Sequence, residues 1–210
     1  MRLEDIEDSG MFEILESQKV EANNQFGKFV EKNYEDWFTD VNGPVMSHTL
    51  FKEWVQPELK GQPTLLVVVD NLRYDQWFAF EETVSSYYKK TDEKSYVSIL
   101  PTATQYARNA IFSGLTPLAM EKKYPDWWKN DTDEGGKNLF EDKFLGEQIK
   151  RLGLNLKWEY HKITNLKKAY KTKSQMLQVL KCDRLAAHIE RLRLCNCAYL
   201  FDVSGAVNLG

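Results

Sequence analysis

The sequence predicts an α/β fold in which a parallel sheet is flanked by helices and preceded by a helical segment. The first observation is the run at 65–69, which is apolar without alternation and therefore typical of a parallel strand buried on both faces. The second is the alternation of strand-like and helix-like patterns between residues 65 and 160. The third is a helical pattern over residues 1–39, ahead of the first strand.

The helical segment at 1–39 carries apolar side chains at three- and four-residue spacing, which places them on one face. We interpret this stripe as core packing, with a partner surface as the alternative. Its members are Phe26, Phe29, Val30, Tyr34, Trp37 and Phe38.

The segment between the stripe and the first strand is predicted to contain a second short helix. Residues 42–44 read Asn-Gly-Pro and end the first helix. A short helix starts at Ser47, and residues 61–63, Gly-Gln-Pro, form the hinge into the sheet. The inward-facing residues of this helix are expected to be Leu50, Phe51, Trp54 and Val55.

Helix-like and strand-like patterns alternate after the first predicted strand. A crossover helix is predicted over 75–88 and a second strand over 96–100. A further helix runs from Gln105 to Gly114, a residue suited to a C-terminal cap. The polar segment 124–137 is predicted to be an exposed acidic loop, with a lid as the alternative.

The remaining elements follow the same patterns. A helix is predicted over 140–152, ended by Gly153, and a strand over 154–160. This strand delivers His161, which we interpret as a structural residue and not as a metal ligand. Residues 172–193 form a basic amphipathic pattern, and residues 198–203 resemble a strand.

Composition indicates a globular chain and excludes several classes of protein. The chain has 210 residues, 42% hydrophobic content and a net charge of −3, with no strongly basic face, so strong nucleic-acid binding is not indicated. No apolar run reaches 18 residues, and the acidic N-terminus does not resemble a secretory signal. The three cysteines fall within the last thirty residues and form no disulfide framework, so we predict a cytoplasmic protein.

Two residues stand where an α/β fold binds ligands. Asp70 ends the apolar run, and the carboxyl end of such a strand is the usual ligand-binding edge. It is either a metal ligand or an acid that caps the next helix. Thr104 follows a strand and a proline turn, where it either caps a helix or acts as a nucleophile facing an anion.

Two segments resemble a known family. Residues 66–77 (LVVVDNLRYDQW) and 98–117 (SILPTATQYARNAIFSGLTP) are similar to the PglZ domain of the alkaline phosphatase superfamily. More closely, they are similar to the effector half of PorX-type response regulators, which act in two-component signalling and control type IX secretion. The similarity extends over roughly residues 1–165 and includes 22–24, 32–34 and 36–38. It implies a partial alkaline-phosphatase-like sheet.

The resemblance also implies a site. It makes Asp70 a zinc ligand and Thr104 both a zinc ligand and the nucleophile, in a centre that holds two zinc ions in this superfamily. Thr102 is the rival nucleophile, and Asn109 and Arg108 are weaker candidates for contacting phosphate oxygens. For Arg108 the interpretation we favour is a solvated residue on the helix surface. The implied reaction is zinc-dependent hydrolysis of a phosphodiester, such as an oligonucleotide.

Beyond about residue 170 the resemblance ends, and we expect a truncated or frame-shifted product. The predicted division is a helical linker or assembly segment (1–60), the N-terminal part of a PglZ-like domain (61–170) and a divergent segment (171–210). The family completes its zinc sites with an Asp near a Ser-His and with an Asp-His pair, and we find neither here.

Two functions are therefore expected. The first is the effector region of a PorX-like response regulator with impaired phosphodiesterase activity. The alternative is a non-catalytic signalling module that regulates type IX secretion and binds a signalling protein, or a second copy, through its helical segment.

Overall fold

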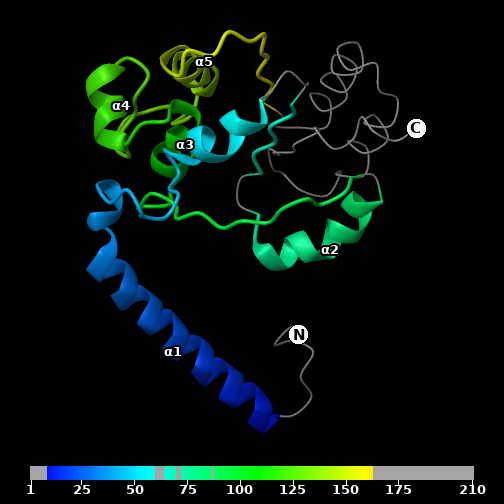
Figure 1. Cartoon of the computed structure of the whole chain (residues 1–210). Helices are drawn as coiled ribbons and strands as arrows, with labels where there is room; N and C mark the ends of the chain where they lie inside the picture. Colours follow the sequence, from blue (N-terminus) through cyan, green and yellow to red (C-terminus); the bar gives the residue numbers. More distant parts are fainter. Residues whose placement is uncertain (1–8, 60–63, 70–71, 87, 163–210) are drawn as a thin grey trace. The chain divides into compact units, whose positions relative to one another are not determined.

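The computed structural model describes residues 9–59, 64–69, 72–86 and 88–162 (Figure 1). The chain divides into an N-terminal unit, Met1–Pro44, and a second unit, Val45–Gly210, which are described separately. Asp70, the predicted helix at 172–193, the predicted strand at 198–203 and the three cysteines lie outside the described residues. In the described part, no helix is long and apolar enough to cross a membrane.

The N-terminal unit consists of α1 (Ser9–Asn33) and a 3₁₀ turn, η2 (Asp36–Phe38), which confirms the predicted helical segment. The aromatic stripe clusters where α1 ends: the ring centroids of Phe29 and Trp37 lie 5.6 Å apart, and those of Tyr34 and Phe38 lie 5.2 Å apart. Phe26 is 62% exposed and Phe29 is 53% exposed. The prediction that the stripe is core packing is therefore wrong for these two rings and for Phe38, which is also exposed.

The second unit begins with a turn held by backbone and side-chain hydrogen bonds. Val97 N–H donates to the Val45 carbonyl at 2.8 Å, and Ser47 N–H donates to the Val97 carbonyl at 3.2 Å. The buried Ser47 hydroxyl accepts from Ile99 N–H at 3.1 Å. Two short helical turns follow, η3 (Phe51–Val55) and η4 (Gln56–Glu58), and Phe51 is buried as predicted.

The predicted parallel sheet is wrong for the residues that the structure describes. The runs at 65–69, 96–100 and 154–160 form no strand there, and their pairing is limited to a single parallel bridge between Met46 and Val97. The apolar character of 65–69 does produce partial burial, since Val67 is buried. Burial requires only covering atoms, whereas a strand also requires a neighbouring backbone at hydrogen-bonding distance. An apolar run in the sequence predicts burial, but it does not predict a neighbouring backbone.

The helices of this unit follow the predictions except for α4, which was not predicted. They are α2 (Tyr74–Ser85), the π-helical turn η5 (Thr104–Arg108), α3 (Asn109–Ser113), α4 (Pro117–Lys123) and α5 (Glu141–Arg151). Gly114 adopts the left-handed conformation (φ 60°) directly after α3, and Gly153 does so after α5 (φ 66°). Both glycines end helices as predicted, because this conformation strains residues that carry a Cβ.

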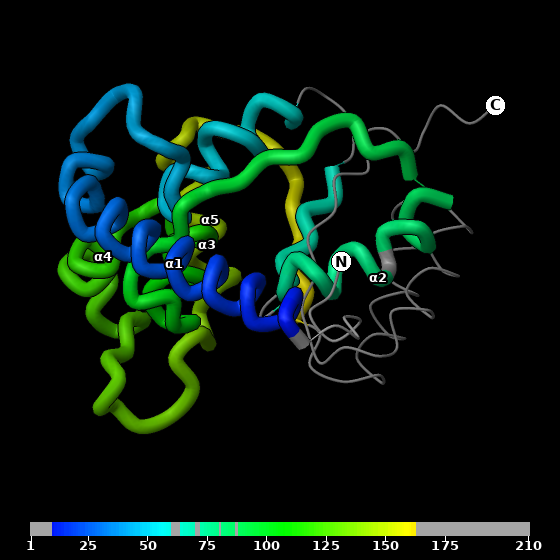
Figure 2. The backbone as a smooth tube through the Cα atoms, turned by 90° about the horizontal axis from the view of Figure 1, so that it is seen from below, coloured from blue at the N-terminus to red at the C-terminus, as the bar shows by residue number. Residues whose placement is uncertain are grey.

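The core lies where α3 packs against α5 (Figure 2). Every residue of α3 is buried, and α5 contributes buried Phe144, Leu145 and Ile149. The Gln148 side chain donates to the carbonyls of Ile111 and Phe112, both at 3.0 Å. These bonds pair carbonyls near the end of α3, where a helix leaves backbone oxygens unpaired. The segment that begins at Thr104 is thereby fixed to α5.

Candidate functional site

Thr104 opens a continuous helical segment made of η5 and α3. The residue in the N-cap position is Ala103, which has an extended conformation (φ −67°, ψ 151°) and accepts from Ala107 N–H at 2.9 Å. Thr104 is therefore the first residue of the segment, and the interpretation of Thr104 as the helix cap is wrong. Its side chain is half-buried, while the rival Thr102 is exposed and lies before the segment.

Of the two residues predicted to bind zinc, Asp70 and Thr104, the structure describes only Thr104. Thr104 offers a hydroxyl at a partly accessible position, and Asp70 offers a carboxylate, although Asp70 lies outside the described residues. Carboxylate oxygens are established zinc ligands in proteins, alongside Cys sulfur and His nitrogen. Within the described ranges no group of three or more His, Cys, Asp or Glu side chains could hold a metal. The His161 Nε2 atom lies 3.1 Å from a carboxylate oxygen of Glu159.

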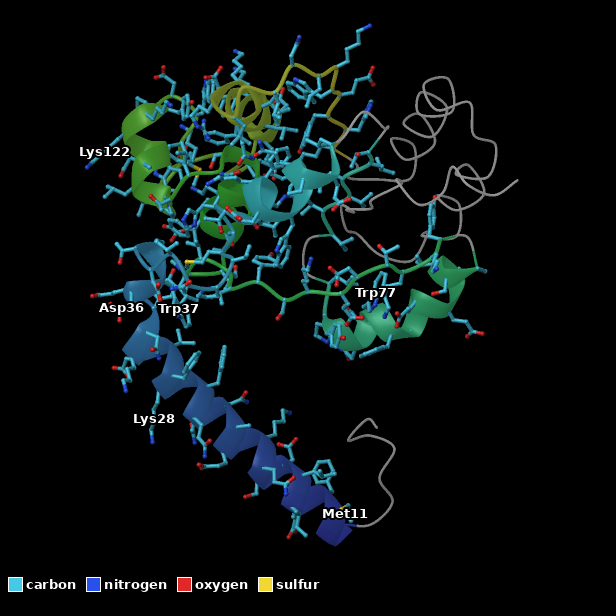
Figure 3. The ribbon with its side chains drawn as sticks, in the orientation of Figure 1. Met11, Lys28, Asp36, Trp37, Trp77 and Lys122 are labelled. Carbon is cyan, nitrogen blue, oxygen red and sulfur yellow. The ribbon has the colours of Figure 1, made fainter. Side chains whose placement is uncertain are left out.

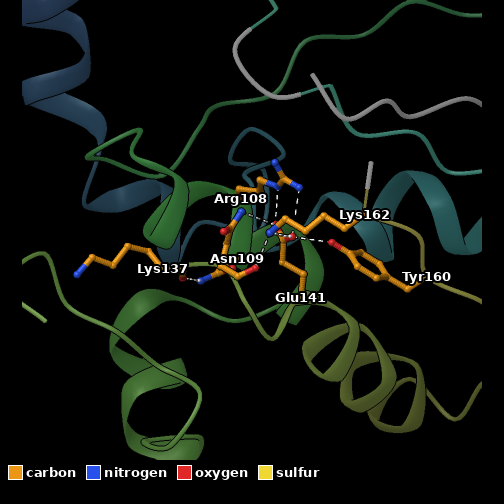
Figure 4. Close-up of polar contacts among 7 residues, drawn as sticks. Arg108, Asn109, Lys137, Glu141, Tyr160 and Lys162 are labelled. Carbon is orange, nitrogen blue, oxygen red and sulfur yellow. Dashed lines mark hydrogen bonds and ion pairs between the residues drawn. The ribbon is translucent and has the colours of Figure 1, made fainter. Parts of the chain in front are cut away.

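Arg108 lies in a buried polar cluster centred on Glu141, which is 1% exposed (Figure 4). The Arg108 Nε atom lies 2.5 Å from Glu141 Oε1, and its Nη2 lies 3.2 Å from Oε2. Lys162 Nζ lies 3.0 Å from the same carboxylate, and the Tyr160 hydroxyl donates to it at 2.6 Å. Burial, followed by the negative charge of Glu141, raises the pKa of Tyr160.

This cluster places the Arg108 guanidinium inside the protein and not on a solvated helix face. A buried carboxylate is stable only when it is paired, so Glu141 needs these cations. The role of Arg108 as a phosphate contact stays a prediction, and it would require the guanidinium to face away from Glu141. The sequence alone did not pair Arg108 with Glu141, because 33 residues separate them.

Asn109 is fully buried beside this cluster and links α3 to the following loop. Its Nδ2 donates to the Lys137 carbonyl at 3.0 Å. Its Oδ1 has no hydrogen-bond partner among the residues that the structure describes. Burying an acceptor without a partner costs about 1–3 kcal/mol. The predicted substrate contact of Asn109 stays untested, since the side chain is enclosed here.

The sequence analysis favoured an exposed acidic loop at 124–137, but this loop contacts the first turn of the Thr104 segment. The Asp131 carboxylate accepts hydrogen bonds from the side chains of Gln105 and Tyr106, the latter at 3.1 Å. The Trp128 ring lies 5.7 Å from that of Tyr106 and is buried. Burial, and then the Asp131 carboxylate, raise the pKa of Tyr106. The only signal in the sequence was the composition of the loop, which combines acids, turn residues and tryptophans.

A hollow of about 440 Å³ lies between α2 and residues 88–93. Trp77 (labelled in Figure 3) and Val84 contribute apolar walls. Lys90 pairs with Glu93 at 2.7 Å and also with Glu81. These charged groups are partly exposed and also line the hollow.

Comparison with protein families assigns both parts of the chain. Residues 50–181 match the model of the BREX system PglZ alkaline phosphatase-like domain, and residues 1–38 match that of the PorX response regulator linker domain. A search of curated proteins found no match. The first match covers more than half of the 210 residues and contains Thr104 and its surroundings. The chain therefore belongs to the PglZ alkaline phosphatase-like domain family, joined here to a PorX-type linker.

Proposed function

We propose that the chain is a PorX-like effector whose PglZ-type domain hydrolyses phosphodiesters with the help of bound zinc. The order of a PorX linker and an alkaline phosphatase-like domain supports a PorX-like effector. The observation that carries the catalytic part is the position of Thr104, a half-buried hydroxyl residue that begins a helical segment of ten residues. The proposed process is control of type IX secretion.

The residues of the chain would act through the hydroxyl and the helix. The Thr104 Oγ1 atom, after releasing its proton to solvent, would attack phosphorus while the bond from phosphorus to the leaving oxygen breaks. Water would then hydrolyse the phosphate ester formed on Thr104. The positive end of the helical segment favours an anion in front of Thr104. Asp70 and Thr104 would hold the metal, and when bound, zinc supplies Lewis-acid stabilisation of hydroxyl and phosphoryl oxygens.

The test is zinc content and hydrolysis of bis(4-nitrophenyl) phosphate by the purified chain, beside Asp70→Ala and Thr104→Ala. Thr102→Ala is the matched control, because it removes an exposed hydroxyl two residues before the site. We expect Thr104→Ala to lower kcat by at least about 100-fold and Thr102→Ala to leave it nearly unchanged. Retained turnover in Thr104→Ala would remove Thr104 as nucleophile, and loss in Thr102→Ala alone would transfer the role to Thr102.

A second candidate is a non-catalytic signalling or interaction module. The observation in its favour is the pair of exposed rings, Phe26 and Phe29, on an α1 helix that lies within the linker-domain match. A folded protein with neither zinc nor turnover would select this candidate. Sedimentation of the wild type beside Phe26→Ser would then show whether the stripe mediates self-association, with Lys28→Ser, an exposed substitution on the same helix, as the control.

A further inference from the structure

Three side chains of α5 hold the helical segment that begins at Thr104. They are Glu141, Gln148 and Arg151. Gln148 and Arg151 donate to backbone carbonyls of residues 111–113, at the far end of the segment. Glu141 pairs instead with Arg108, which lies one helical turn after Thr104. Of these three contacts, the one made by Glu141 is therefore nearest to the proposed nucleophile along the chain.

The pair formed by Glu141 and Arg108 is buried and joins the two side chains at two points (Figure 4). The Glu141 side chain is 1% exposed and that of Arg108 is 10% exposed. The guanidinium places Nε against one carboxylate oxygen, at 2.5 Å, and Nη2 against the other, at 3.2 Å. A guanidinium that meets both oxygens of a carboxylate is held in orientation as well as in distance.

The Glu141 carboxylate is itself fixed by other groups. The Tyr160 hydroxyl donates to it at 2.6 Å, Lys162 Nζ lies 3.0 Å from it, and Asn138 Nδ2 donates to it at 3.4 Å. Glu141 is also the first residue of α5, where the unpaired N–H groups of a helix favour a negative side chain. The carboxylate is thus a fixed point from which Arg108 can be oriented.

The first turn of the segment has a second contact, and this one is exposed. Asp131 accepts hydrogen bonds from Gln105 and Tyr106, but it lies on an exposed part of its loop. Water competes with exposed hydrogen bonds and charges, which lowers their net contribution. The buried pair is therefore the contact that we expect to limit motion of this turn.

A buried ion pair contributes defined geometry more than net stability. The cost of removing both charges from water offsets their attraction, and an apolar pair of similar volume is often as stable. The two-point contact nevertheless sets the position and the angle of the groups that it joins. A nucleophile needs such geometry, because a displacement of about 1 Å can lower a rate about 100-fold.

We propose that Glu141 is a positioning residue: through its pair with Arg108 it fixes the first turn of the helical segment, and with it the Thr104 hydroxyl. This inference rests on the proposed phosphodiesterase function. It goes beyond that function because it assigns a role to a residue that supplies neither the nucleophile nor a proposed zinc ligand. Arg108 is the link between Glu141 and Thr104.

The test compares the contacts at the two ends of the segment. The full chain is loaded with zinc, and kcat and KM for bis(4-nitrophenyl) phosphate are measured for the wild type, Glu141→Gln and Glu141→Asp. Arg151→Met is the matched control, because it removes a side chain of the same helix that binds the far end of the segment. Urea unfolding of each variant identifies conditions in which all four proteins are folded.

We expect Glu141→Gln to lower kcat at least about tenfold and to change KM less than about threefold, because positioning is lost and not binding. Glu141→Asp keeps the charge but withdraws the carboxylate, so it should also lower kcat, and it replaces Glu141→Gln if that variant does not fold. Arg151→Met should keep kcat within about twofold of the wild type. An unchanged kcat in both Glu141 variants, a loss carried by KM alone, or an equal loss in Arg151→Met would overturn the proposal and leave the proposed function standing.

A second measurement does not require turnover. Hydrogen exchange of backbone amides, followed by mass spectrometry, should be about tenfold faster over residues 105–109 in Glu141→Gln than in the wild type, with residues 144–149 of α5 unchanged. Arg151→Met should leave exchange over 105–109 unchanged. Absence of turnover in the wild type would count against the proposed function, and exchange then decides the role of Glu141. Equal exchange over 105–109 in Glu141→Gln and the wild type would reject positioning by Glu141.

Discussion

The core around α3 and α5 and the segment around α2 differ in how their side chains are covered. In the first region, α5 buries Phe144, Leu145 and Ile149 together with two polar residues. In the second, α2 buries only Val84 among its described side chains, and Phe78 is 56% exposed. Both regions were predicted to be helices against one sheet. The difference shows that a helical pattern identifies a helix without showing what covers it.

The largest expected effect contrasts one phenylalanine from each region. Phe144 is 1% exposed, and its ring centroid lies 5.8 Å from that of Tyr124 and 5.7 Å from that of Trp127. Phe144→Ala should lower the free energy of unfolding by about 3–5 kcal/mol, because it leaves a cavity. Phe78→Ala should cost less than about 1 kcal/mol. Urea unfolding of both variants measures the contrast, and similar losses would show that the two regions are equally packed.

The next effect tests the buried carboxylate of the core. Glu141→Gln removes the negative charge that pairs with Arg108 and Lys162, and should cost about 3 kcal/mol of unfolding free energy. The double variant Arg108→Met/Glu141→Leu should be less destabilised than Glu141→Gln, since it leaves no unpaired guanidinium. Chemical unfolding gives both values. A double variant that is destabilised as much as Glu141→Gln, or more, would contradict this expectation.

A smaller effect separates two glycines with positive φ. At Gly114 (φ 60°) a Cβ atom would overlap the Gln148 side chain, whereas at Gly135 (φ 90°) it would meet open space. Gly114→Ala should therefore cost about 2 kcal/mol or more, from strain and displacement of Gln148, and Gly135→Ala about 1 kcal/mol from strain alone. Thermal unfolding compares them. Equal losses would show that backbone strain is the whole effect at both sites.

The smallest effect is a dependence on pH. The fold raises the pKa of Tyr160 above its ordinary value of 10.0, so the stability contributed by this phenol is fully present below about pH 10. It is lost as the pH rises from there toward the higher pKa of the folded state. Tyr160→Phe should be less stable than the wild type at pH 8, and the gap should narrow above pH 10. Tyr74 and Tyr106 also have raised pKa values. Both residues are present in the wild type and in Tyr160→Phe, so their titration cancels in the difference between the two proteins.

If the difference in unfolding free energy between the wild type and Tyr160→Phe stays constant across this range, the contribution of Tyr160 to stability does not depend on its contact with Glu141. Unfolding free energies measured in denaturant between about pH 8 and pH 11 decide the point.

Local patterns in the sequence were sufficient to predict most helices. The three- and four-residue spacing predicted α1, α2 and α5. Gly114 and Gly153 marked the ends of α3 and α5. These signals are local, because hydrogen bonds in a helix join residues four positions apart. The resemblance of 66–77 and 98–117 to the PglZ domain is also a property of the sequence, and the family match at 50–181 confirms it.

The pairing of distant groups was decided only by the tertiary structure. Whether residues 65–69 and 96–100 become strands depends on a neighbouring backbone, and in the described residues they form none. Arg108 finds Glu141 33 residues away, and Gln105 finds Asp131 26 residues away. No spacing in the sequence encodes such contacts, because the chain must first fold for these side chains to meet. The composition of a segment determined that it carries charge, and the packing around it determined which charge it meets.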